Sequence, residues 1–200
     1  MPTPAPPLLL ASASPRRREL LAANHLLFDV QSAEIDESRR NDEAPDAYVL
    51  RLATSKAQAL ADSFPYHLIL GADTIVVLDG QIFGKPADLA EAQTMLAKLS
   101  ARTHHVLTGV CLLPPGEPPL AWVSKTEVTF KLLTAEVIRL YFSLVSPLDK
   151  AGAYAIQEHG ELLVSSYCGL LSNVIGLPVE VVLQRLASLY PDHFPPQEQS

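Results

Sequence analysis

A short polar segment near the start of the chain has the composition of an anion-binding loop. Residues 8–11 form an apolar run typical of a buried strand, and Ser14-Pro15 combines a favourable helix N-cap with a favourable first helical residue. The first helical turn then carries Arg16-Arg17, which the positive end of a helix dipole disfavours unless an anion joins them. We predict that the backbone amides, these arginines and the hydroxyls of Ser12 and Ser14 bind a phosphate-like anion. The alternative is a solvated basic helix end.

Carboxylates form a second group of candidate functional residues. Glu34, Asp36 and Glu37 follow the second expected strand. Asp73 lies between two apolar strand-like pieces, where a lone carboxylate is costly unless it is paired, hydrogen-bonded or bound to metal. Asp73 is therefore either a turn aspartate, or a metal ligand or general base.

Two lysines, Lys56 and Lys85, add positive charge to this set. Carboxylates can hold Mg²⁺, which bridges phosphate oxygens, and cationic side chains stabilise the charge that develops on a phosphate. Gly84-Lys85-Pro86 is not a P-loop, because it lacks that motif's spacing and hydroxyl residue. His104-His105 is not expected to bind metal, since adjacent side chains point to opposite faces of a strand. The residues alone predict a nucleotide or phosphate site.

Composition limits the class of protein. The chain has 200 residues, 48% of them hydrophobic, which suits one domain (1–200) and excludes a disordered chain. Fifteen basic and 22 acidic residues give a net charge of -7, which argues against a protein that coats nucleic acid. The uncharged stretch 162–179 is interpreted as a strand, a turn and a loop inside a core rather than a membrane span. Cys111 and Cys168 are expected to be buried free thiols in a soluble cytoplasmic protein.

Helical and strand patterns alternate along the chain. Segments 1–7 and 191–200 are expected to be frayed tails of the single domain. Several strands are joined by hairpins, so we expect an α/β fold with a mixed rather than a purely parallel sheet. Helices are predicted over residues 15–24, 45–63, 88–99, 134–144 and from 178, and strands over 8–11, 28–31, 68–72, 74–78, 81–83, 106–113, 121–131, 152–156 and 161–167.

Several blocks together resemble the Maf family of nucleoside triphosphate pyrophosphatases. They are Ala11-Ser12-Ala13-Ser14-Pro15-Arg16-Arg17-Arg18-Glu19-Leu20-Leu21, Tyr48-Val49-Leu50-Arg51-Leu52-Ala53 with Lys56, Gly71-Ala72-Asp73-Thr74-Ile75-Val76, Gly84-Lys85-Pro86, Leu99-Ser100 to Thr103-His104, Asp149-Lys150-Ala151-Gly152-Ala153-Tyr154-Ala155-Ile156-Gln157 and Asn173-Val174-Ile175-Gly176-Leu177-Pro178. The blocks span nearly the whole chain in order. Two positions depart from the family pattern, Leu171 for a tyrosine and Ala155 for a glycine.

The resemblance implies a fold and a reaction. The implied fold is a mixed twisted sheet with flanking helices and two lobes around a nucleotide cleft, similar to inosine triphosphate pyrophosphatases. The implied reaction is hydrolysis between the α- and β-phosphates of a nucleoside triphosphate, giving a monophosphate and pyrophosphate. A divalent metal cation (Mg or Mn) and a homodimer are implied too. From the composition we expect no nucleic-acid and no membrane partner.

The resemblance also implies roles for residues. Asp73 would activate water and bind metal, Glu34 would be a metal ligand or a co-base, and phosphates would be held by Ser12, Ser14, Arg17, Lys56 and Lys85. The chain resembles the family branch acting on dTTP and UTP, which has Arg16, Thr74 and Gln157 at its specificity positions. A glutamine amide can accept a hydrogen bond from the pyrimidine N3–H and donate one to a neighbouring carbonyl. The alternative function is a nucleotide-sensing regulator of cell division or septum formation with little turnover.

Overall fold

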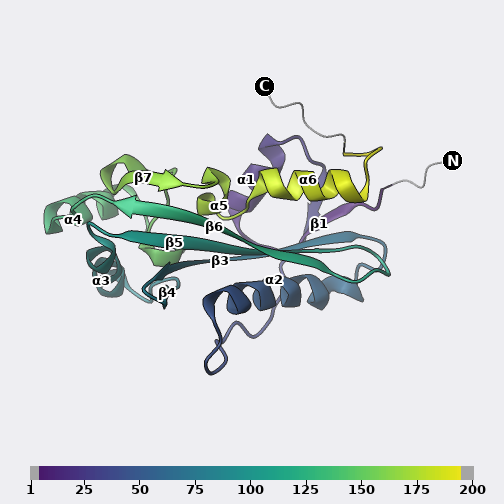
Figure 1. Cartoon of the computed structure of the whole chain (residues 1–200), viewed down its shortest axis with the longest axis horizontal. Helices are drawn as coiled ribbons and strands as arrows, with labels where there is room; N and C mark the ends of the chain where they lie inside the picture. Colours follow the sequence, from purple (N-terminus) through teal and green to yellow (C-terminus); the bar gives the residue numbers. More distant parts are fainter. Residues whose placement is uncertain (1–4, 195–200) are drawn as a thin grey trace.

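One mixed sheet organises the molecule. The computed structural model describes residues 5–194, and Figure 1 shows helices on both faces of its sheet. The sheet order is β2-β1-β3-β5-β6-β7, with β4 paired to β3. The elements are β1 (Leu8–Leu10), α1 (Pro15–Ala23), β2 (Phe28–Val30), α2 (Pro45–Ala61), β3 (Leu68–Leu78), β4 (Gln81–Phe83), α3 (Leu89–Leu99), β5 (Thr103–Leu113), β6 (Leu120–Phe130), α4 (Ala135–Leu144), η1 (Ala151–Ala153), η2 (Gly160–Leu162), β7 (Val164–Cys168), α5 (Leu171–Ile175) and α6 (Val179–Leu189).

The sheet is parallel at one side and antiparallel across the rest. β1 pairs in parallel with both β2 and β3, whereas β3, β5 and β6 pair antiparallel and are 11 residues long each. The β3–β4 hairpin turns at Asp79 and Gly80, which both have positive φ, as a tight two-residue hairpin turn requires. The expected mixed α/β sheet is therefore confirmed.

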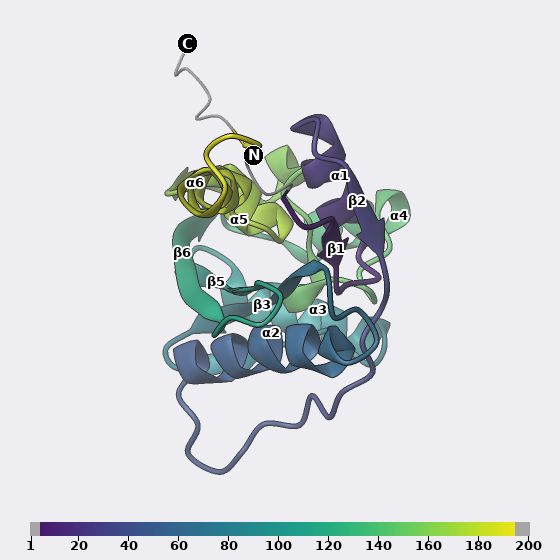
Figure 2. The same cartoon turned by 90° about the vertical axis from the view of Figure 1, so that its right-hand side faces the viewer.

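Two halves with separate apolar cores share the long strands. One core lies among α3, α4, β4 and the ends of β3, β5 and β6, and includes Phe83, Leu96 and Tyr141. In the other half, α1 and α6 cover one face of the sheet and α2 covers the opposite face, as the side and end views show (Figures 1 and 2). The second half contains the parallel strands β1 and β2.

Helix α2 approaches the sheet through two glycines. A Cβ added to Gly71 in β3 would lie 2.1 Å from the carbonyl oxygen of Ala53, and one added to Gly109 in β5 would lie 2.3 Å from that of Val49. Both obstacles are helix backbone, which cannot rotate away as a side chain can. These two positions therefore set the spacing between α2 and the strands, and with it the position of every α2 side chain.

Asp73 lies in the middle of a continuous strand. The two strand pieces predicted around it are one strand, β3, and Asp73 pairs with Gly109 of β5. The turn-aspartate alternative is therefore wrong. His104 is buried and His105 is not, so the two rings do face opposite sides of β5 as expected. Burial lowers the pKa of His104 to about 4, with a smaller effect of the His105 charge, and its ring contacts the Tyr154 hydroxyl at 2.8 Å.

Other predictions fail after residue 150. The strand expected over 152–156 is wrong, because Gly152 and Ala153 have positive φ and form part of a short 3-10 turn. Helix α5 occupies part of the expected loop and is five residues long, too short to show a period. Both cysteines are free, but Cys168 is exposed because β7 is an edge strand.

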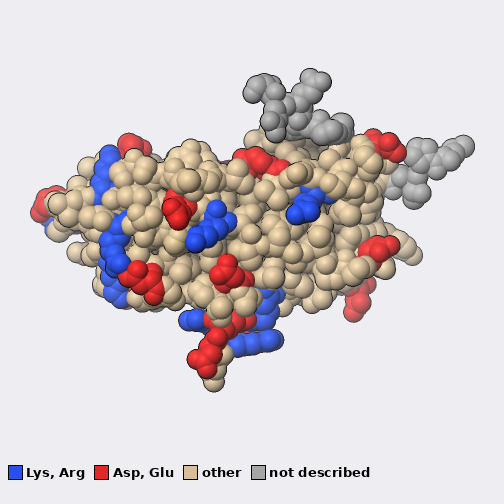
Figure 3. All heavy atoms as spheres, viewed as in Figure 1, with Lys and Arg blue, Asp and Glu red and all other residues tan. Residues whose placement is uncertain are grey.

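The predicted tails fall partly outside the described residues. Positions 1–4 and 195–200 are not described. Of the inner parts, the Ala5 amide donates to Nε2 of His193 at 3.1 Å, and Phe194 packs against the core beneath α6. Within residues 5–194, none of the helices is long and apolar enough to cross a membrane. Charges of both signs are interspersed on the face shown in Figure 3.

Candidate active site

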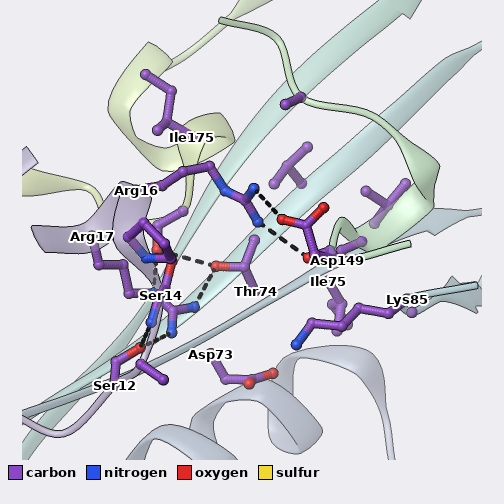
Figure 4. A pocket seen from close by; sticks show the side chains of 18 of the residues that line it. Ser12, Ser14, Arg16, Arg17, Asp73, Thr74, Ile75, Lys85, Asp149 and Ile175 are labelled. Atoms are coloured by element: carbon purple, nitrogen blue, oxygen red, sulfur yellow. Dashed lines mark hydrogen bonds and ion pairs between the residues drawn. The ribbon is translucent and has the colours of Figure 1, made fainter. Parts of the chain in front are cut away.

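A pocket of about 500 Å³ lies where the two halves meet. Its walls come from the loop after β1, the start of α1, the middle of β3, α2, and the segment after α4, which are far apart in sequence (Figure 4). The volume is in the usual range for small-molecule sites. Nine of the ten predicted site residues line it: Ser12, Ser14, Arg16, Arg17, Lys56, Asp73, Thr74, Lys85 and Gln157.

The buried guanidinium of Arg17 organises one wall. It donates to the Ser12 hydroxyl at 2.9 Å, to the Thr74 hydroxyl at 3.1 Å and to the Gly176 carbonyl at 2.8 Å. All three acceptors are neutral, and burial lowers the pKa of Arg17, which a nearby Asp73 charge only partly offsets. A buried cation whose direct partners carry no charge favours an anion in the adjoining pocket.

The start of α1 adds to this preference. Ser14 occupies the N-cap position as predicted, but its side chain makes no capping bond, and the first turn has no acidic residue. The helix therefore presents free backbone amides and its positive dipole end to the pocket. Arg18 is exposed and does not line the pocket, so the basic cluster is divided between the pocket and solvent.

Thr74 links this wall to the sheet. Its hydroxyl receives the Arg17 hydrogen bond, contacts the Thr108 hydroxyl at 3.0 Å, and lies 3.2 Å from the Gly176 carbonyl. The Thr74 hydroxyl accepts from Arg17, and its single proton is engaged by the Gly176 carbonyl or by Thr108. Thr74 therefore shapes the pocket by position rather than through a free polar group.

Two carboxylates converge on one ammonium at the opposite wall. Lys56 of α2 lies 2.6 Å from Asp73 Oδ1 and 2.8 Å from Glu37 Oε1. The Asp73 side chain is 13% exposed, whereas that of Glu37 is 56% exposed and comes from the loop between β2 and α2. Burial opposes ionisation of Glu37, but the hydrogen bond and charge of Lys56 outweigh it and lower the pKa of Glu37.

Glu34 and Glu37 lie differently from the sequence expectation. Both side chains are exposed, but only Glu37 lines the pocket. The sequence offered three acids in an irregular segment, where no period says which side chain turns inward. Lys85 follows β4 and extends into the pocket on the side of Asp73, as Figure 4 shows.

The loop over residues 31–44, which carries Glu37, is fastened to α2. Arg51 donates to both carboxylate oxygens of Glu43, at 2.6 and 2.8 Å, and also to the Ser38 carbonyl at 3.0 Å. The Tyr48 hydroxyl donates to the Glu37 carbonyl at 2.8 Å. A two-point arginine–carboxylate pair fixes direction as well as distance. Arg51 and Tyr48 therefore keep Glu37 near Lys56, although the loop extends beyond α2 (Figure 2).

This fastening predicts an acid-sensitive stability component. The Arg51 hydrogen bond lowers the pKa of Glu43 from 4.5 to about 2. A carboxyl with a depressed folded-state pKa stabilises the fold above its unfolded pKa and loses that contribution as pH falls through the folded value. We expect Glu43→Gln to flatten the dependence of the urea midpoint on pH between 4.5 and about 2, compared with wild type. Parallel curves for the two proteins would contradict the role of this pair.

The remaining wall holds the residues expected to select the base. Arg16 donates to Asp149 Oδ2 at 3.0 Å and to the Asp149 carbonyl at 3.2 Å. Gln157 is exposed on the same segment and lines the pocket. The three predicted specificity residues, Arg16, Thr74 and Gln157, thus line one pocket. Arg16 and Gln157 come from opposite halves of the molecule.

The carboxylates fit a hard divalent cation. Asp73 and Glu37 contact the same ammonium, so their oxygens already point at one positive charge. Across residues 5–194, no group of three or more His, Cys, Asp or Glu side chains is gathered for a metal. Mg²⁺ is commonly held by only one or two carboxylates, with water and substrate phosphates completing the shell. The donor set therefore fits a cation that arrives with a phosphate ligand.

Together these features define an α/β protein whose pocket sets a cationic helix start against a carboxylate–lysine cluster. The family model described as "Maf-like protein" matches residues 7–189. The chain is 47% identical to a dTTP/UTP pyrophosphatase of Akkermansia muciniphila, over 92% of this chain and 97% of the relative. It is 51% identical to the dTTP/UTP pyrophosphatase of Myxococcus xanthus, over 86% of this chain and 87% of that relative. A nucleoside triphosphate pyrophosphatase of Xylella fastidiosa is 49% identical, over 90% and 97%.

The chain belongs to the Maf-like protein family.

Proposed function

We propose that this protein hydrolyses the α–β phosphoanhydride of dTTP and UTP, releasing nucleoside monophosphate and pyrophosphate. The observation that carries the proposal is the pairing, in one pocket, of the α1 anion site with the Asp73–Lys56–Glu37 cluster. The names of relatives 47–51% identical supply the substrate class.

Each wall has a role in this reaction. The triphosphate lies along the α1 amides, with Ser12, Ser14, Arg17, Lys56 and Lys85 opposing its charge. Asp73 accepts a proton from the attacking water, a task suited to a carboxylate fixed on a strand. Lys56, which contacts Asp73 at 2.6 Å and Glu37 at 2.8 Å, would be able to turn to a phosphate oxygen if a bound cation neutralised these carboxylates.

We propose Asp73 and Glu37 as the residues that hold a divalent cation, Mg²⁺ or Mn²⁺. When bound, the cation supplies charge neutralisation at the phosphate oxygens and lowers the pKa of bound water. Glu34, the ligand expected from the sequence, is exposed and would need the 31–44 loop to rearrange before joining this set.

The proposed base selectivity follows from hydrogen-bond patterns. Uracil and thymine present a carbonyl, an N3–H and a second carbonyl, whereas cytosine and adenine present an amino group at one of these places. Arg16 supplies donors for the carbonyls, and the Gln157 amide both accepts and donates. Thr74 lines the same pocket.

The substrate proposal is tested by measuring pyrophosphate release. We expect dTTP and UTP to be hydrolysed with a higher kcat/KM than CTP, dATP or GTP, with Mg²⁺ or Mn²⁺ present. A preference for purine triphosphates would refute the substrate assignment. Binding without turnover would instead favour the regulatory alternative.

We also propose a cellular location and an oligomeric state for this protein. We place the protein in the cytoplasm, which the two free cysteines support. We propose a homodimer, supported by the exposed apolar side chains of Leu140 and Leu144 on one side of α4. Light scattering at micromolar concentration tests the dimer, and a monomer mass would refute it.

A further inference from the structure

A chain of charges lies behind the wall that holds Arg16 and Gln157. Arg16 contacts Oδ2 of Asp149, and the other carboxylate oxygen of Asp149 accepts from Lys150 at 2.9 Å. Lys150 also donates to the Ser146 carbonyl at 2.9 Å and lies 3.3 Å from Glu158 Oε2. Arg16, Asp149, Lys150 and Glu158, here called the clasp, thus form one continuous network.

The centre of the clasp is buried. Lys150 is 5% exposed and does not line the pocket, so it cannot meet a ligand there directly. A buried ammonium is costly unless paired, and here two carboxylates and a carbonyl surround it. Burial opposes ionisation of Asp149, but hydrogen bonds from Lys150 and Arg16 outweigh it and lower the pKa of Asp149.

The clasp joins parts of the chain that have no shared element. Arg16 belongs to α1, and its bond to Asp149 spans 133 residues. The other members flank η1, whose backbone has positive φ at Gly152 and Ala153 and is not held by a strand ladder. The segment is tied to α4 by the Ala155 amide, which donates to the buried Tyr141 hydroxyl at 2.9 Å. Side-chain bonds, together with the backbone bond from the Gly152 amide to the Gly84 carbonyl at 3.0 Å, therefore fix this wall in place of a strand ladder.

We propose that Asp149, Lys150 and Glu158 are positioning residues for base selection: they hold Arg16 and the Gln157 segment at the separation that a pyrimidine dione fits. The inference rests on the proposed function. Oδ2 and the backbone carbonyl oxygen of Asp149 each accept one N–H from a terminal nitrogen of Arg16. The remaining guanidinium donors are left for the base. Glu158 follows Gln157 directly in the chain, and its ion pair with Lys150 holds that part of the segment in place.

A loosened clasp has a specific consequence for catalysis. Asp149, Lys150 and Glu158 make no hydrogen bond or ion pair with Asp73 or Arg17, so the residues proposed for the phosphates and the attacking water keep their partners when these three are substituted. What is lost is discrimination, because a mobile guanidinium satisfies several base patterns equally well. We expect the dTTP-over-dATP ratio of kcat/KM to fall about tenfold, the size expected from misplacing one charge-assisted hydrogen bond.

The test compares Asp149→Asn, Lys150→Met and Lys150→Arg with wild type. Steady-state kinetics with dTTP and dATP give the selectivity, and calorimetry with their α,β-methylene analogues gives affinities without turnover. Asp79→Asn is the matched control, since Asp79 pairs with Arg102 in an exposed hairpin turn away from the pocket. Lys150→Arg keeps the charge and is expected to retain more selectivity than Lys150→Met.

Each outcome decides the proposal. A loss of selectivity in Asp149→Asn and Lys150→Met, with kcat for dTTP changed less than the ratio, supports it. An unchanged dTTP-over-dATP ratio of kcat/KM, whether or not both values fall, overturns it, because a merely structural residue affects all substrates alike. If Lys150→Met fails to fold, the 58% exposed Asp149 side chain still permits the Asp149→Asn test. If the wild-type protein prefers another base, the substrate assignment is refuted. The clasp variants are then tested for loss of that preference instead.

Discussion

Asp73→Asn is expected to lower kcat roughly 10³-fold, within the range attributed to a positioned general base. Asparagine keeps the size of the side chain but cannot accept a proton from water at neutral pH. Asp73 lies in the middle of β3, whose residues 69–77 pair with β5, so we do not expect the substitution to displace the backbone. KM for dTTP is expected to change far less, because Arg17 and the α1 amides remain. Pyrophosphate release and calorimetry measure the two effects.

The two nearby glutamates provide a matched comparison. Glu37→Gln removes a carboxylate that contacts Lys56 at 2.8 Å, whereas Glu34→Gln alters an exposed side chain outside the pocket. The first variant is expected to weaken activation by Mg²⁺, and the second to behave as wild type. Normal turnover by Asp73→Asn, or a stronger effect at Glu34 than at Glu37, would reject these assignments.

Gly71→Ala is expected to lower the free energy of unfolding by about 3 kcal/mol or more, at the upper end for overpacking. The new Cβ would lie 2.1 Å from the Ala53 carbonyl oxygen and 3.0 Å from the Ala57 amide nitrogen. Only a displacement of α2 relieves both contacts, and α2 carries Lys56. Urea unfolding measures the loss, and a rise in KM is expected in any folded fraction.

Gly84→Ala separates this effect from the general cost of replacing glycine. Gly84 has no atom within 4 Å of an added Cβ and no positive φ. Its unfolding midpoint is expected to stay near that of wild type. If the urea midpoint of Gly71→Ala also stays near that of wild type, α2 can be displaced with little loss of unfolding free energy, which would contradict the packing described.

Local sequence signals predicted the parts of the site that depend on local structure. The start of α1 was predictable because Ser14, Pro15 and the arginines that follow lie within one turn. Asp73 stood out because its neighbours on both sides are apolar. The mixed sheet followed from hairpins interspersed with helices.

What escaped prediction depends on long-range contacts or irregular backbone. The sequence could not tell that Glu37 rather than Glu34 lines the pocket, because the path of the 31–44 loop is set by Arg51 and Tyr48 on the next helix. Helix α5 contains Ser172 and Asn173, both buried, and Asn173 is held by β5 and β6 rather than by helix propensity. The Arg16–Asp149 contact has no local signature at all.

The bond from Arg17 to the Gly176 carbonyl bridges 159 residues, and this has a consequence for folding. Contacts of such sequence separation form late, because loop closure must be completed before they contribute stability. A chain emerging from the ribosome cannot complete the anion site until Gly176 has been synthesised, however early β1 and α1 form. During refolding, recovery of nucleotide binding is therefore expected to report the last step of assembly, after the helical signal has returned.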